Sequence, residues 1–109
     1  MNELSFELYA CTGWRPKVDV YRCADGWLVK LEIAGVAEQD IRTEVKHDVL
    51  IVEGRRRDLC IPNILEPLSM EINYDHFRRT IRLPGVIESM QIRTEYSEGM
   101  LLIKLRNRE

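Results

Sequence analysis

The most reactive side chains in this sequence are three cysteines and two histidines, and their spacing supports no catalytic or metal-binding site. Cys11, Cys23 and Cys60 stand far apart, no CxxC pair occurs, and His47 and His76 lie at no metal-ligand spacing from them. A nucleophilic Cys–His pair formed only by folding is not excluded by sequence. We predict unremarkable thiols, with oxidation sensing or subunit crosslinking by Cys11 or Cys60 as the alternative.

The charged residues also argue against several functional classes. The run Arg55-Arg56-Arg57 lies between Glu53 and Asp58, which favours a solvated strand end over a phosphate site. No G-x-x-x-x-G-K-[ST] phosphate loop occurs. The formal net charge of −2 is unlike that of a dedicated nucleic-acid-binding protein. We therefore expect no enzymatic activity, no cofactor, no bound metal and no nucleic-acid partner.

Length and composition indicate one soluble domain. A chain of 109 residues with 45% hydrophobic and 31% charged residues can form a single modest core. The N-terminus lacks signal-peptide features, and no apolar stretch is long enough to cross a membrane. Because the cysteines are odd in number and widely spaced, a disulfide framework is not expected. These observations favour the cytoplasm and no membrane partner.

Apolar residues recur with a period of two along most of the chain, which predicts β-strands. A single helical turn at 41–45 is not excluded. Turn residues separate the segments at intervals typical of an antiparallel β-sandwich. The expected strands are 17–21, 27–34, 41–45, 49–55, 74–83, 90–96 and 100–105.

Two segments do not fit a simple β-sandwich in which each strand has one buried face and one solvent-exposed face. Residues 56–73 are long for a hairpin loop and rich in apolar residues, so we expect them to be buried against something such as another subunit. In the last strand, Leu101, Ile103 and Leu105 share one face, and Met100 and Leu102 lie on the other. That second face should therefore also be covered, by another strand, the N-terminal arm or a partner.

Five short motifs occur in order across most of the chain. They are Pro16-Lys-Val-Asp-Val-Tyr21, Leu31-Glu-Ile-Ala-Gly-Val36 followed by Asp40-Ile41, Leu50-Ile-Val-Glu-Gly54, Phe77-Arg-Arg-Thr-Ile-Arg-Leu-Pro84 and Gly99-Met-Leu-Leu-Ile-Lys-Leu105. Ile81 stands where the fourth pattern has an aromatic residue, and Met100 where the fifth has valine. Together the motifs resemble the α-crystallin domain of small heat-shock proteins.

This resemblance implies an all-β, immunoglobulin-like sandwich and an ATP-independent holdase chaperone that binds unfolding proteins. It also implies a homodimer in which residues 68–72 of the long loop form a strand on residues 17–21 of the partner, by strand addition. The implied dimer-interface residues are Val18, Val20, Tyr21, Leu68, Met70, Ile72 and Arg79. The implied client or peptide groove, which we expect to be apolar, is lined by Ile41, Thr43, Val45, Met90, Ile92 and Thr94.

Arg79 has the parity of the core residues Phe77 and Ile81, so its charge needs acceptors. The favoured interpretation is an ion pair, within or between subunits, that fixes the dimer. The alternative is a side chain that extends to the sheet edge.

The sequence departs from the family at both ends. We expect a short arm at 1–15, an α-crystallin domain at 16–105 and a truncated tail at 106–109 without an I-x-I motif. These departures favour a dimer or small homo-oligomer over a large assembly. The alternative function is an interaction module of the CS-domain type that recognises one folded partner, although such a domain has no need of the long loop.

Overall fold

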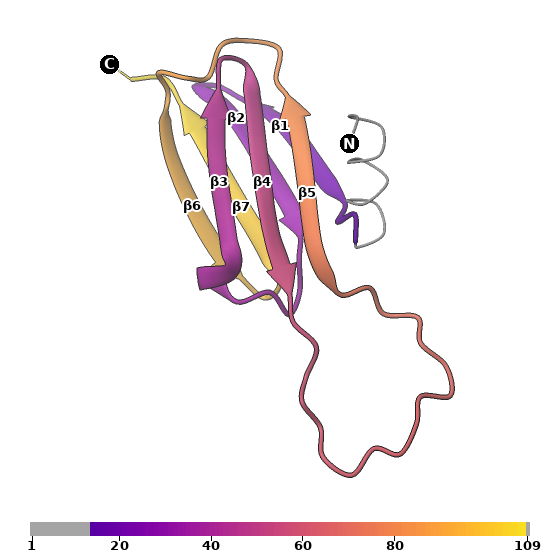
Figure 1. Ribbon diagram of the computed structural model, residues 1–109. Coiled ribbons are helices and arrows are strands. Elements are labelled where there is room, and N and C mark those ends of the chain that lie inside the picture. The colour runs from indigo at the N-terminus through magenta and orange to yellow at the C-terminus, as the bar shows by residue number, and fades with distance from the viewer. Residues whose placement is uncertain (1–13, 109) are drawn as a thin grey trace, which may run out of the picture.

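Alternating apolar residues give seven β-strands in the part of the chain that this computed structural model describes, residues 14–108 (Figure 1). One short 3₁₀ turn, η1 (Glu38–Asp40), precedes the third strand. The strands are β1 (Val18–Cys23), β2 (Gly26–Glu32), β3 (Ile41–Lys46), β4 (Val49–Arg56), β5 (Asp75–Arg82), β6 (Gln91–Ser97) and β7 (Met100–Arg106).

The strands form two antiparallel sheets that pack face to face. One sheet has the order β1-β2-β7-β6, and the other has the order β3-β4-β5. Side chains that alternate along each strand fill the space between the sheets, including Val29, Leu31, Leu50, Ile103 and Leu105, all of them without solvent exposure. The predicted immunoglobulin-like, all-β sandwich is therefore confirmed.

Two glycines allow close approaches at the ends of β2 and β7. A Cβ on Gly26 would collide with the carbonyl oxygen of Leu105 on the neighbouring strand. Gly99 has a φ of +79° in the β6–β7 turn, where a Cβ would lie 2.9 Å from that of Ala34. Its carbonyl oxygen accepts a hydrogen bond from the backbone N–H of Ile33 at 2.8 Å. The chain therefore turns at Gly99 between β6 and β7.

The second face of β7 points away from the core. Met100 is exposed and Leu102 is half-buried. Leu102 lies directly opposite Lys30 on β2 and Glu95 on β6, and Lys104 pairs with Glu95 at 3.0 Å. No other strand of the described chain covers this face. Long charged side chains flank Leu102, and their stems shield apolar surface in such positions.

The segment between β4 and β5 extends away from the sandwich as a long loop, seen below the strands in Figure 1. Residues 68–72 form no strand within the single chain, and every residue from 57 to 73 is exposed. The expected burial of this segment therefore does not occur against residues 14–108 of the same chain. Among the described residues, no helix is long and apolar enough to cross a membrane.

Candidate functional site

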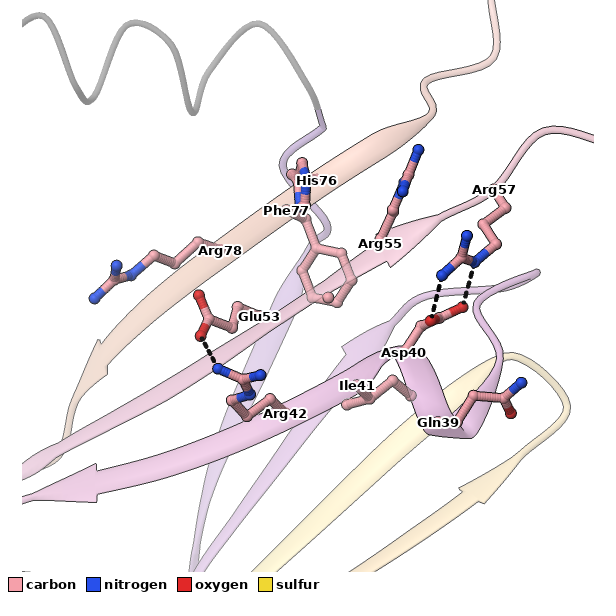
Figure 2. Close-up of a pocket in the computed structure, with 11 residues that line it drawn as sticks. Gln39, Asp40, Ile41, Arg42, Glu53, Arg55, Arg57, His76, Phe77 and Arg78 are labelled. Carbon is pink, nitrogen blue, oxygen red and sulfur yellow. Dashed lines mark hydrogen bonds and ion pairs between the residues drawn. The ribbon is translucent and has the colours of Figure 1, made fainter.

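The base of the loop is closed by the three consecutive arginines that end β4 and begin the loop. Arg55 Nε lies 3.0 Å from a carboxylate oxygen of Asp75, the first residue of β5. Arg57 donates two hydrogen bonds to the carboxylate of Asp40, at 3.0 and 3.1 Å (Figure 2). The arginines are largely solvent-accessible, as expected, but their binding of three different segments around the loop base was not predicted.

Arg56 makes the largest set of contacts of the three. Its Nε donates to the backbone carbonyl oxygen of Asn73 at 2.9 Å, and Nη1 donates to that of Ala34 at 3.0 Å. Its guanidinium lies 3.6 Å from the ring centroid of Trp14, and this ring packs edge-on against Phe77. One side chain therefore holds together both ends of the loop, the turn after β2 and the segment that leads into β1.

The Asp40–Arg57 pair fixes the charge of both partners. The hydrogen bonds from Arg57 hold the pKa of the Asp40 carboxyl below its ordinary value, while partial desolvation acts in the opposite direction. The pKa of Arg57 is raised by the same hydrogen bonds. Both groups are therefore ionised at neutral pH, and the contact is a bidentate, charge-assisted one.

Beyond its base the loop presents a series of large apolar side chains to solvent. Leu65 is 99% exposed and Leu68 is 90% exposed. Large exposed apolar side chains that cluster on one segment usually mark an interaction surface. The full set in this loop is Leu59, Ile61, Ile64, Leu65, Leu68, Met70 and Ile72. The last three are predicted dimer-interface residues.

The other predicted half of the dimer interface lies on β1, which is an edge strand of its sheet. Val18 is half-buried against the core, whereas Val20 and Tyr21 are exposed. One side of β1 pairs with β2, and no strand of the described chain pairs with its other side. An edge of this kind can accept a further strand.

Arg79 lies on β5 among core residues, as predicted, but its contact differs from the expected one within the chain. Its Nη1 donates to the backbone carbonyl oxygen of Pro16 at 2.6 Å, and no ion pair joins it to another described residue. Its Nε is buried without an acceptor in residues 14–108. Burial lowers the pKa of Arg79, and the charge of Arg15 lowers it further.

The predicted groove corresponds to a hollow of about 430 Å³ between the edges of β3 and β6, the strands at the open side of the two sheets. Ile41, Thr43 and Thr94 line this hollow. Val45 and Met90 instead pack against the core, and Ile92 is 40% exposed outside it. The rest of the lining is Glu38, Glu95, Tyr96 and Leu101, and the two glutamates make the hollow more polar than expected.

The described residues contain no group of three or more potential metal ligands. Cys23, at the end of β1, and Cys60, in the long loop, are exposed free thiols. Cys11 and residues 1–13 of the predicted arm lie outside the part of the chain that the structure describes.

The family model described as Hsp20/alpha crystallin family matches residues 19–109, which include β2 to β7 and all of β1 except its first residue. The chain belongs to this family. The prediction that this chain is a small heat-shock protein is therefore confirmed. It rested on five motifs, each of which is short.

Two curated relatives illustrate the level of similarity. A probable 15 kDa heat shock protein of Leptospira interrogans is 27% identical over 86% of this chain and 71% of its own length. Small heat shock protein C2 of Rickettsia felis is 23% identical, again over 86% of this chain but only 61% of its own length. The matched region therefore covers a larger share of this chain than of either relative.

Solved structures agree with the sandwich. Heat shock protein 16.0 of Schizosaccharomyces pombe has a TM-score of 0.77 at 25% identity, with 88% of this chain and 89% of that chain covered. HSP18.5 of E. histolytica has a TM-score of 0.68 at 26% identity, with 86% and 88% covered. The similarity therefore extends over nearly all of the fold described above.

Proposed function

We propose that this small heat-shock protein is an ATP-independent holdase that binds partly unfolded proteins and suppresses their aggregation. The observation that supports this most directly is the loop between β4 and β5, which exposes seven large apolar side chains. A chain that binds unfolding proteins withdraws them from aggregation by mass action and needs no nucleotide for this. The CS-domain alternative is not favoured, because it leaves the loop without a role.

We further propose a homodimer in which loop residues 68–72 add to the β1 edge of the partner. Three apolar residues at every second position, Leu68, Met70 and Ile72, match the side-chain period of a strand. The exposed Val20 and Tyr21 on β1 would be covered by the same contact. An α-crystallin domain at 16–105 is part of this proposal.

Arg79 would act in this dimer through its buried Nε, which lacks an acceptor in the described chain. A partner carboxylate or carbonyl oxygen would reduce the cost of burying this group. Arg79→Gly should then disorder or dissociate the dimer. An unchanged sedimentation profile together with an unchanged melting temperature would contradict this role.

The hollow between β3 and β6 is the proposed second binding surface, for an extended peptide of a client or a neighbouring subunit. Its two bordering strands are sheet edges, so they can bind a peptide backbone while Ile41 contacts an apolar side chain.

We also propose a cytoplasmic location, which the exposed free thiols of Cys23 and Cys60 support.

Light scattering tests the holdase proposal. A protein that aggregates on heating or on disulfide reduction is followed with and without this chain, in the absence of ATP. We expect suppression by the wild-type chain, weaker suppression by the double variant Leu65→Ser/Leu68→Ser, and wild-type behaviour of Val86→Ser.

Val86 is a matched control because it is also exposed, at 54%, but lies outside the loop. Absence of suppression by a several-fold molar excess of the wild-type chain would overturn the holdase proposal. Equal loss in the Val86 and loop variants would overturn the assignment of client binding to the loop.

A further inference from the structure

A hollow of about 730 Å³ lies on the three-stranded sheet at the end where the long loop begins, and of its lining only Ile41 also lines the proposed groove between β3 and β6. Gly54 makes room there, because a Cβ at this position would lie 2.5 Å from the carbonyl oxygen of Asp40 and 2.7 Å from the Phe77 ring. Its apolar lining consists of Ile41, which is half-buried, and the Phe77 ring, which is buried.

The charged side chains around this hollow carry an excess of positive charge. Four arginines and two acidic residues line it, although the whole chain has a net charge of −2. Arg57 is bound to Asp40, and Arg42 lies 3.9 Å from Glu53 (Figure 2). Arg55 pairs with Asp75, which lies outside the lining.

Arg78 differs from the other arginines of the hollow. It is exposed on β5, and within residues 14–108 no ion pair or side-chain hydrogen bond holds it. The hollow thus combines an accessible guanidinium with a small apolar surface. An acidic side chain next to an apolar one is the complementary ligand.

The first half of the long loop, residues 58–66, has this chemistry. It contains Asp58 and Glu66 and no lysine or arginine. Glu66 follows Leu65, whose side chain is 99% exposed, and Glu66 forms no ion pair with another described residue. The loop therefore offers a carboxylate beside an exposed apolar side chain, in a segment of net negative charge.

We propose that the hollow on β3, β4 and β5 binds loop residues 58–66 of a second copy of this chain, with Glu66 on Arg78 and Leu65 against Ile41. This contact goes beyond the proposed strand exchange, because it uses the half of the loop that precedes residues 68–72. It leaves those residues available for the β1 edge and so adds a second, charge-dependent contact between copies.

Charge reversal with rescue in a mixture tests this contact. Sedimentation velocity over a range of concentrations gives the dissociation constant for self-association of the wild type, Arg78→Glu, Glu66→Lys and an equimolar mixture of the two variants. We expect each single variant to associate roughly three- to tenfold more weakly, because like charges then face each other. The mixture should recover wild-type association, since every contact between unlike chains again joins opposite charges.

Arg93→Glu and Glu88→Lys are the matched controls, since both residues are exposed and lie outside the hollow and the loop. They should associate like the wild type. The proposal would be overturned if the single variants had the same dissociation constant as the controls. It would also be overturned if the mixture associated as weakly as each variant alone. Rescue by the double variant Arg78→Glu/Glu66→Lys without rescue in the mixture would show a contact within one chain and would also overturn it. None of these readouts depends on holdase activity, so the two proposals can fail separately.

Discussion

The core of the sandwich and the long loop use the same kinds of apolar residue in opposite ways. Val29, Leu31 and Ile103 are completely buried between the two sheets, whereas Leu65 and Leu68 of the loop are almost completely exposed. The core residues occupy every second position of hydrogen-bonded strands, so the side chains are buried while the backbone groups are paired. The loop residues have no such partner strand in the described part of the chain.

This difference separates folding from binding. Burial of the core residues stabilises the single chain, while the loop residues contribute almost nothing to its stability and remain available for a partner. The arginines at the loop base lie between these two regions. They fix where the loop leaves the sandwich without burying its apolar side chains.

The sharpest test of the separation compares one substitution in each region. Ile103→Ala should lower the free energy of unfolding by about 2–5 kcal/mol, because it removes buried methyl groups and leaves a cavity. Leu65→Ser should change it by less than about 0.5 kcal/mol, because its side chain is exposed. Urea unfolding of both variants at the same protein concentration measures the difference. A large loss of stability in Leu65→Ser would mean that the loop is part of the folded core.

Most of the fold was predictable because each strand carries a local signal. The parity of Phe77, Ile81 and Leu83 correctly predicted an inward face for β5, with Arg79 among these residues. Strand ends were less accurate: β1 was expected at 17–21 and is Val18–Cys23. Local periodicity does not specify where a neighbouring strand stops providing hydrogen bonds.

The contacts of the loop base were not predictable from the same signals. We predicted a solvated strand end for the run from Arg55 to Arg57. In the structure these arginines bind Asp75, Asn73 and Asp40, which lie 17 or more residues away along the chain. Only the folded chain brings these groups together. The hollow between β3 and β6 was similarly misjudged as apolar, because Glu38 and Glu95 enter it from positions outside the predicted set.

Arg56 provides the second test, since it connects the two regions. Arg56→Ala removes its hydrogen bonds to Asn73 and Ala34 and its stacking on Trp14, so we expect a loss of about 1–3 kcal/mol. Hydrogen exchange should accelerate most at residues 73–75 and at the turn after β2, and much less in β7. Arg93→Ala, an exposed arginine of β6, is the control. Uniform acceleration across all strands would contradict a local role for Arg56 at the loop base.

The smallest expected effect concerns the Asp40–Arg57 pair and depends on pH. Because the pKa of Asp40 is lower in the folded chain than its ordinary value of 3.8, its ionised form stabilises the fold. This contribution is complete above the ordinary pKa and is lost as the pH falls through the lower, folded value. Asp40→Asn should therefore reduce stability slightly at pH 7 and leave it nearly unchanged under strongly acidic conditions, as measured by thermal unfolding across pH. Glu44→Gln, a change on the exposed side of β3, is the control. A deficit of the same size in Asp40→Asn at every pH would show that the pair acts through packing, and the loop base would then resemble the core more closely than the contacts of its arginines indicate.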